Sequence, residues 1–278
     1  MKGKLQSWNI AEEGIKQRSK RKPPVAPTKA EYDFYDRYIK KVSKETKNRN
    51  SFILGATPEL LDIALENNFV AYCLDLSKKI IDFCNSIMKY KDSPNKKLKQ
   101  GNWIDMNFKN DFFSIVLGDA PFINMSTKEH NEELFNILNK QIMPKEYLVI
   151  RHLALPNLKP IPKSKLVSLY RQRKITFPDF FMELRIIIYQ DKVYNKRTYQ
   201  YDSKRNFDLI EEDYKKNIFN KKERDKLMAY RTNVINTFIP EKIFLKMAEK
   251  QGFNIIEIFQ DNKFRFQNYL RMYAFQKR

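Results

Sequence analysis

Short apolar runs alternate with amphipathic stretches along the middle of the chain. Five runs have the length and composition of buried strands: 51–55, 70–75, 98–103, 113–119 and 147–153. Between them, apolar residues recur at helical spacing in three stretches: 58–66, 77–90 and 127–140. The run at 113–119 is nearly all apolar, as in a parallel strand that is covered on both faces. This alternation predicts a doubly wound α/β sheet of mostly parallel strands.

Both ends of the chain depart from this alternation. The segment 16–27 is basic and proline-rich, which predicts an extended, solvated connector, and 32–47 has the spacing of a helix leading into the core. Residues 163–235 read as helical segments around a polar stretch, with no clear strand. Another helix at 240–251 precedes two late strands at 253–259 and 269–276. The long helical insertion predicts a cap over the ligand-binding edge of the sheet, and we expect the last strand to be antiparallel.

Four regions follow from this pattern. Residues 1–50 form a basic N-terminal extension with the lead-in helix, and 51–160 form the Rossmann-like core. Residues 161–240 form the helical cap and substrate region, and 241–278 complete the core sheet.

The positive charge lies on the flanks of the chain. The 278 residues carry a formal net charge of +20, of which +8 falls in 1–50, zero in 51–160 and +12 in 161–278. One interpretation is a basic face for an acidic partner such as nucleic acid. The other is a general abundance of Lys, Asn and Ile, and the sequence leaves both open.

Several classes of protein are excluded or disfavoured by composition. No apolar run reaches the ~18 residues of a membrane-spanning helix, and the polar start of the chain predicts no secretory signal, so we expect a cytoplasmic protein. Cys73 and Cys84 are the only cysteines, which argues against a disulfide scaffold. With two histidines far from both, we expect no metal site.

Glycine and aspartate mark the ends of the predicted strands. Only six glycines occur, and Gly55, Gly101 and Gly118 lie where ligands bind in open α/β sheets. Asp75 follows Gly55 by 20 residues, the spacing at which a carboxylate accepts hydrogen bonds from ribose hydroxyls. The first turn lacks the further glycines of a dinucleotide fingerprint, and no P-loop is present.

The segment 54–60, LGATPEL, resembles motif I of class I S-adenosylmethionine (SAM)-dependent methyltransferases, in the subgroup that reads LGxTPEL. The resemblance continues through 75–77, 101–103, 113–119 and 148–151, and covers about residues 20–155 well. It implies a Rossmann-like methyltransferase fold, SAM as the cofactor and 51–160 as the SAM-binding core.

The resemblance also implies roles for individual residues. Asp75 would hold the ribose hydroxyls, Leu76, Asn102 and Trp103 would contact the adenine, and Asp119 would lie at the methionine end. The full set implied to contact SAM is Gly55, Ala56, Thr57, Glu59, Asp75, Leu76, Ser77, Asn102, Trp103, Gly118, Asp119 and Ala120.

Methyl transfer is an in-line displacement that placement and desolvation can accelerate without a dedicated base. Asp119 is the candidate catalytic residue, and Arg151 could hold an acidic substrate group, with His152 beside it. The segment 119–122 nearly matches the [DNS]PP[YFW] motif of amino-methyltransferases, in which the aromatic, here Phe122, stacks on the target amine. The alternative is a strand exit with Phe122 in the core.

Three functions remain open. The leading hypothesis is a SAM-dependent methyltransferase with an unidentified, small-molecule acceptor recognised by the cap. The second is a nucleic-acid amino or ribose methyltransferase that uses the basic flanks and 119–122. The third is a non-catalytic binding protein on the same fold, with the oligomeric state open in every case.

Overall fold

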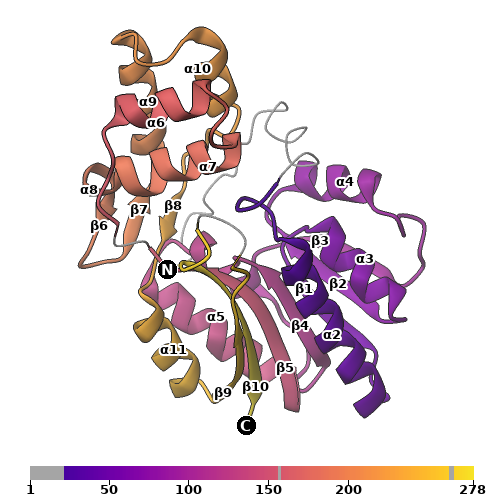
Figure 1. Ribbon diagram of the computed structural model, residues 1–278. Helices are drawn as coiled ribbons and strands as arrows, with labels where there is room; N and C mark the ends of the chain where they lie inside the picture. The colour runs from indigo at the N-terminus through magenta and orange to yellow at the C-terminus, as the bar shows by residue number, and fades with distance from the viewer. Residues whose placement is uncertain (1–21, 156–157, 263–265) are drawn as a thin grey trace.

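A seven-stranded sheet forms the centre of the computed structural model, which describes residues 22–155, 158–262 and 266–278 (Figure 1). The strands lie in the order β3-β2-β1-β4-β5-β10-β9. Their bounds are β1 (Asn50–Leu54), β2 (Val70–Asp75), β3 (Lys96–Gln100), β4 (Phe113–Asp119), β5 (Ile142–Leu153), β9 (Phe253–Phe259) and β10 (Leu270–Lys277). Strands β1 to β5 pair in parallel, and β10 is antiparallel to both of its neighbours. The predicted doubly wound, mostly parallel sheet is confirmed.

Helices cover both faces of this sheet, because successive strand residues point to opposite sides. Ile53 and Leu117 pack towards α2 (Lys29–Glu45), α3 (Pro58–Glu66) and α4 (Lys78–Ile87). Phe52 and Val116 pack towards α5 (Lys128–Gln141) and α11 (Glu241–Lys250). None of the described helices is both long enough and apolar enough to cross a bilayer.

A helical cap stands over the carboxyl ends of the strands (Figure 1). It has a hydrophobic core of its own, which includes Phe180, Tyr201 and Phe207. Its helical elements are α6 (Lys163–Arg171), α7 (Phe177–Met182), the π-helix η3 (Glu183–Ile188), α8 (Gln190–Val193), α9 (Ser203–Lys215) and α10 (Lys221–Met228).

The cap also contains strands that the sequence pattern did not predict. β6 (Tyr194–Asn195), β7 (Gln200–Asp202) and β8 (Ile235–Thr237) form a small antiparallel sheet. The expectation of no strand in 163–235 is therefore wrong. Strands of two or three residues are too short to show an alternation of polar and apolar positions, and β7 and β8 are about thirty positions apart in the chain.

Two further expectations need correction. Residues 22–27 of the predicted solvated connector form a turn against the core, with Pro24 and Ala26 buried; residues 16–21 lie outside the described part. The predicted strand 98–103 ends at Gln100, and Trp103 begins the short 3-10 helix η1 (Trp103–Asp105). The side chain of Asn102 ends the strand because it accepts a hydrogen bond from the amide of Ile104 and caps this turn.

Candidate active site

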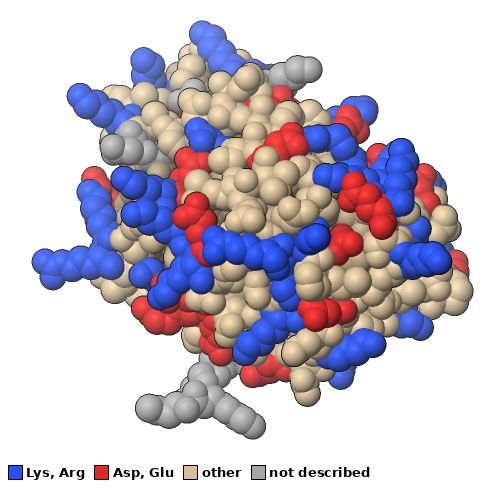
Figure 2. All heavy atoms as spheres, turned by 90° about the horizontal axis from the view of Figure 1, so that it is seen from below, with Lys and Arg blue, Asp and Glu red and all other residues tan. Residues whose placement is uncertain are grey.

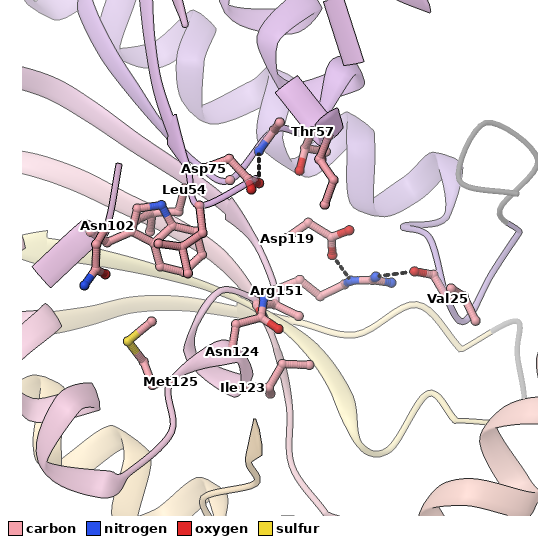
Figure 3. Close-up of a pocket in the computed structure, with 16 residues that line it drawn as sticks. Val25, Leu54, Thr57, Asp75, Asn102, Asp119, Ile123, Asn124, Met125 and Arg151 are labelled. Atoms are coloured by element: carbon pink, nitrogen blue, oxygen red, sulfur yellow. Dashed lines mark hydrogen bonds and ion pairs between the residues drawn. The ribbon is translucent and has the colours of Figure 1, made fainter. Parts of the chain in front are cut away.

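A cavity of about 230 Å³ opens at the carboxyl ends of β1, β2 and β4 (Figure 3). This is the edge at which open α/β sheets bind their ligands. Nine of the twelve residues that the sequence implied for the cofactor line it: Gly55, Ala56, Thr57, Asp75, Leu76, Asn102, Trp103, Asp119 and Ala120.

The turn after β1 requires glycine. Gly55 has a φ of +87°, and a Cβ there would lie 3.2 Å from Cζ2 of Trp103 and 3.6 Å from Oδ2 of Asp75. The indole Nε1 of Trp103 donates to the carbonyl of Leu74 over 2.8 Å, which fixes the ring beside the turn. The wall of the cavity is therefore set by close packing around a backbone without a side chain.

Asp75 connects the two turns of this wall. Its Oδ2 accepts from the amide of Ala56 over 3.0 Å, and its Oδ1 accepts from the amide of Ser77 over 2.9 Å. Each carboxylate oxygen can accept a second hydrogen bond, so both remain able to receive ligand hydroxyls. The amides hold the carboxylate in place before any ligand arrives.

The side chain of Asn102, which the resemblance implied for the adenine, makes two hydrogen bonds within the protein. Besides capping η1 through its Oδ1, it donates from Nδ2 to Oδ2 of Asp105 over 3.2 Å. The side chain still lines the cavity (Figure 3).

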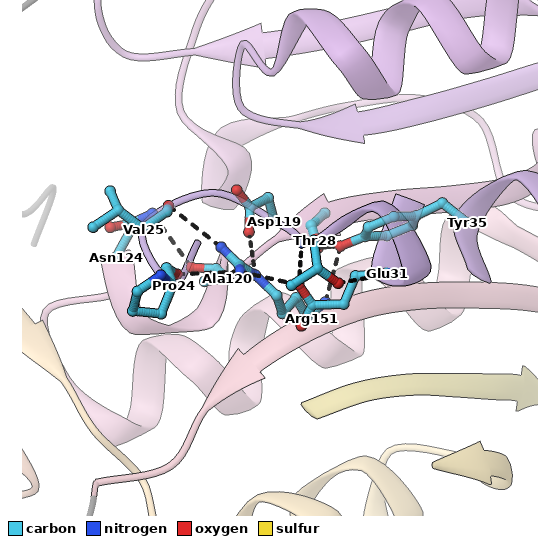
Figure 4. Close-up of polar contacts among 10 residues, drawn as sticks. Pro24, Val25, Thr28, Glu31, Tyr35, Asp119, Ala120, Asn124 and Arg151 are labelled. Atoms are coloured by element: carbon cyan, nitrogen blue, oxygen red, sulfur yellow. Dashed lines mark hydrogen bonds and ion pairs between the residues drawn. The ribbon is translucent and has the colours of Figure 1, made fainter. Parts of the chain in front are cut away.

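Arg151 closes the opposite end of the cavity and is almost fully buried, with 3% of its side chain exposed. Its Nε donates to Oδ1 of Asp119 over 2.7 Å, and Nη1 lies 3.4 Å from Oε2 of Glu31 (Figure 4). The remaining donors reach the carbonyls of Pro24 and Val25. Every guanidinium nitrogen thus has a partner within the protein, so the charge of Arg151 is already balanced. That Arg151 holds an acidic substrate group stays a prediction.

Burial and charge oppose each other within this network. Burial acts to lower the pKa of Arg151, but the carboxylates of Asp119 and Glu31 outweigh it, so the pKa rises. Burial is also the largest influence on Glu31, and it raises the pKa of that carboxyl despite the nearby guanidinium. The hydroxyl of Tyr35 donates to the carbonyl of Gly118 and accepts from the amide of Arg151, which joins α2 to β4 and β5.

His152 and Phe122 do not reach the cavity. His152 follows Arg151 on β5 and therefore points to the other face of the sheet, where its ring stacks 3.8 Å from that of Phe244. Burial lowers the pKa of His152 to about 4. Phe122 lies in η2 (Phe122–Asn124) with its ring centroid 4.2 Å from that of Phe135, in the hydrophobic core. The structure thus corrects the expected substrate contacts of both residues.

The three other residues implied for the cofactor, Glu59, Ser77 and Gly118, do not line the first cavity. Glu59 is exposed on α3, and the hydroxyl of Ser77 caps α4 by accepting from the amide of Ile80. Gly118 gives room to a neighbouring ring, since a Cβ there would lie 2.8 Å from Cγ of Pro121.

A second cavity, of about 240 Å³, lies between the sheet and the cap. Its walls include Arg185 of η3 and residues of the β8 region. It shares part of its lining with the first cavity: Val25, Ala120, Ile123, Asn124 and Arg151. Sequence reasoning missed Val25, Ile123 and Asn124, although the prolines around Val25 were a signal of an ordered turn.

No protein-family model matches the chain, and no curated protein sequence matches it. Solved structures do match in fold. CcbJ methyltransferase of Streptomyces caelestis is 7% identical with a TM-score of 0.58, covering 95% of each chain. The N-methyltransferase NodS of Bradyrhizobium japonicum, in complex with S-adenosylhomocysteine, is 6% identical with a TM-score of 0.52, covering 95% of this chain and 97% of NodS.

A structure from Rhodobacter sphaeroides, described as a zinc-dependent alcohol dehydrogenase, is 12% identical with a TM-score of 0.59, covering 97% of this chain and 99% of that one. At such identities the likeness establishes the fold alone. The described residues contain no group of three or more His, Cys, Asp or Glu side chains placed to hold a metal ion. The fold is that of the Rossmann-like methyltransferases, as the resemblance of the sequence motifs implied.

Proposed function

We propose that the protein is a SAM-dependent methyltransferase, with SAM in the first cavity and a small-molecule acceptor in the second. The observation that carries this proposal is the common wall of Val25, Ala120, Ile123, Asn124 and Arg151, which brings the two cavities together. Two sites side by side are what transfer between two bound molecules requires.

The side chains of the first cavity suit SAM. Asp75 would accept the two ribose hydroxyls, and Trp103 with Leu76 would flank the adenine. Among the described residues, only Oδ1 of the Asp119 carboxylate is hydrogen-bonded, so Oδ2 is available to the cationic methionine end. When bound, SAM supplies a methyl group on a sulfonium that a nucleophile can displace in line.

Placement and desolvation are the means of catalysis that the structure supports. Asp119 lines the first cavity but not the second, and Arg151 already holds it. We therefore propose Asp119 for cofactor orientation rather than as a general base. The apolar second cavity would exclude water from the acceptor, and such placement can supply much of the rate without a base.

The alternative of a nucleic-acid methyltransferase depended on the basic flanks and on the segment 119–122, and the structure does not favour the second of these. Phe122 is 1% exposed and packs against Phe135 and Phe244, so it does not offer a face to a flipped base. On the face opposite the cap, Lys and Arg side chains are interspersed with Asp and Glu (Figure 2). A small acceptor under the cap accounts better for the second cavity.

Calorimetric titration with SAM and with S-adenosylhomocysteine tests the proposal. We expect micromolar binding, weakened roughly 10- to 100-fold in Asp75→Asn because hydrogen bonds to a charged group contribute about 1.5–3 kcal/mol. Asp82→Asn is the matched control, since Asp82 is an exposed carboxylate on α4 that pairs with Lys78. Failure of the folded wild-type protein to bind either compound would overturn the proposal and favour a non-catalytic binding protein.

A further inference from the structure

The second cavity contains a cation, Arg185, that has no carboxylate partner among the described residues. Arg185 lies on the π-helix η3, a form of helix that often occurs at functional sites, and its side chain lines the cavity under the cap. It does not line the first cavity. A role for Arg185 in ligand binding rests on the proposed function, since the second cavity is the acceptor site of that reaction.

The surroundings of Arg185 are aromatic and neutral. Its Nε donates to Oδ1 of Asn206 over 2.8 Å, and its guanidinium carbon lies 4.6 Å from the ring centre of Phe207 and 4.8 Å from that of Phe181. In the described part of the chain, no carboxylate pairs with it. Asn206 uses Nε, and the Tyr201 hydroxyl is the other polar side-chain group that acts on the guanidinium, so Nη1 and Nη2 have no charged partner there.

These surroundings disfavour the charged form of Arg185 as long as no anion pairs with it. Burial lowers the pKa of Arg185 and outweighs the opposing influence of the Tyr201 hydroxyl, whereas the two carboxylates beside Arg151 give that residue a net rise. A buried cation is normally paired, because desolvation of an isolated charge costs several kcal/mol. An anion that enters the cavity would supply the missing partner.

Much of the rest of the cavity is apolar or already hydrogen-bonded. Ser203 donates to Oδ1 of Asn236 over 2.7 Å, and Nδ2 of Asn236 donates to the carbonyl of Ile123 over 3.0 Å. Apolar side chains form much of the remaining wall, among them Leu153, Met182, Ile186, Val234 and Phe238. A ligand that fits must therefore be mostly apolar, with its charge at one place.

We propose that the second cavity binds a largely apolar small molecule that carries one carboxylate, and that Arg185 holds this carboxylate through Nη1 and Nη2. A planar carboxylate matches the two parallel donors of a guanidinium. One guanidinium balances one carboxylate, whereas a phosphate dianion would keep an unbalanced charge in an apolar site. With the acid group at η3, the other end of the molecule faces the wall shared with the first cavity.

Matched acids and amides test this proposal. The probes are 3-phenylpropionate and 4-phenylbutyrate, each compared with its carboxamide by calorimetry, with S-adenosylhomocysteine present and again without it. We expect each acid to bind at least roughly tenfold more tightly than its amide, as a charge-assisted bidentate pair does. In Arg185→Gln the preference should fall below about twofold, with S-adenosylhomocysteine affinity unchanged. Arg185→Lys, which keeps the charge but loses the fork, should keep part of the preference.

Arg205→Gln is the control, because Arg205 is an exposed arginine of the same cap that pairs with Glu212. Three results would overturn the inference: acids and amides that bind alike, acids that do not bind at all, or an acid preference that survives in Arg185→Gln. Should Arg185→Gln not fold, the acid preference of the wild-type protein and its reduction in Arg185→Lys decide between these outcomes.

The same titrations separate this inference from the proposed function. Intact S-adenosylhomocysteine binding without an acid preference overturns the acid site alone. An acid preference without S-adenosylhomocysteine binding supports the acid site and overturns methyl transfer.

Discussion

The two arginines on the cavity walls, Arg151 and the partly buried Arg185, differ in whether carboxylates neutralise them. Arg151 is held by the carboxylates of Asp119 and Glu31 and by two backbone carbonyls. Arg185 has a neutral amide and aromatic rings around it, and no carboxylate partner among the described residues. Both side chains stand at cavity walls, but only one is already paired.

The charge of Arg151 therefore stabilises the fold, whereas the charge of Arg185 can still pair with a ligand. Arg151 ties together β4, β5, α2 and the turn at Pro24 and Val25, so the folded protein depends on it (Figure 4). The side chain of Arg185 donates to Asn206 of α9 and lies over the rings of Phe181 and Phe207, with no ion pair among the described residues. Substitutions of these two residues, and of their neighbours, should therefore differ in size and in kind.

The largest effect should follow from Arg151→Met. The variant leaves Asp119 and Glu31 buried without their cation, and breaking a buried ion pair in this way costs about 3–5 kcal/mol. Urea unfolding measures the free energy of unfolding. The control is Arg37→Met, which removes an exposed pair with Glu257 and should cost less than about 1 kcal/mol. Equal losses in the two variants would mean that Arg151 is not a structural cation.

The next effect concerns His152, which follows Arg151 in sequence and is kept neutral on the other face of the sheet. Because its folded pKa of about 4 lies below the ordinary value of 6.5, the folded state binds fewer protons. Stability is therefore complete above pH 6.5 and declines as the pH falls towards 4, by about 3 kcal/mol.

Unfolding at pH 7 and pH 4 in wild type and His152→Phe measures this contribution. The aromatic variant can stack on Phe244 without a titrating group, so its stability should fall less on acidification. Identical pH profiles would show that burial does not hold His152 neutral.

Phe122→Leu should have an intermediate effect. Loss of about three buried carbons at roughly 0.8 kcal/mol each gives about 2 kcal/mol of destabilisation. Binding of S-adenosylhomocysteine should not change, because Phe122 packs on Phe135 and Phe244 and lines neither cavity. Calorimetry and urea unfolding on the same variant test both statements. A binding loss at unchanged stability would restore the stacking role of Phe122.

The smallest change in stability should come from Arg185→Met. Removal of a partly buried charge that has no carboxylate partner among the described residues is favourable, but it leaves Oδ1 of Asn206 without its donor, at a cost of about 1–3 kcal/mol. These opposite contributions should leave the free energy of unfolding within about 1 kcal/mol of wild type. A loss as large as that of Arg151→Met would show that Arg185 is a structural residue and would remove the contrast between the two cavities.

Much of the first cavity was predictable because its wall comes from segments that directly succeed their own strands. Gly55, Asp75 and Asp119 each stand at the end of an apolar run, and parallel strands place these ends together. Phe122 and His152 were assigned to the substrate because they are close in sequence to such ends. Their contacts depend instead on which way each side chain leaves the backbone and on what α5 and α11 place beneath it.

The second cavity had no comparable signal. Arg185 is one of many basic residues in the last third of the chain, and nothing local distinguishes it from Arg205 or Arg171. The side chains that pack on Arg185 come from α7 and α9. Val25 lines the same cavity, although it is more than 100 positions away in the chain. Such contacts are set by packing between distant elements, which periodicity does not encode.

The sequence by itself determined the alternation of strands and helices in the core, the turn at Gly55 and the placement of Asp75, because hydrophobic periodicity and backbone conformation are local properties. The tertiary structure decided which charges are neutralised, since ion pairing depends on the groups that folding brings within a few ångströms. Arg151 and Arg185 are the same residue type, and both line the second cavity. Folding gave Arg151 two carboxylates and left Arg185 without one among the described residues.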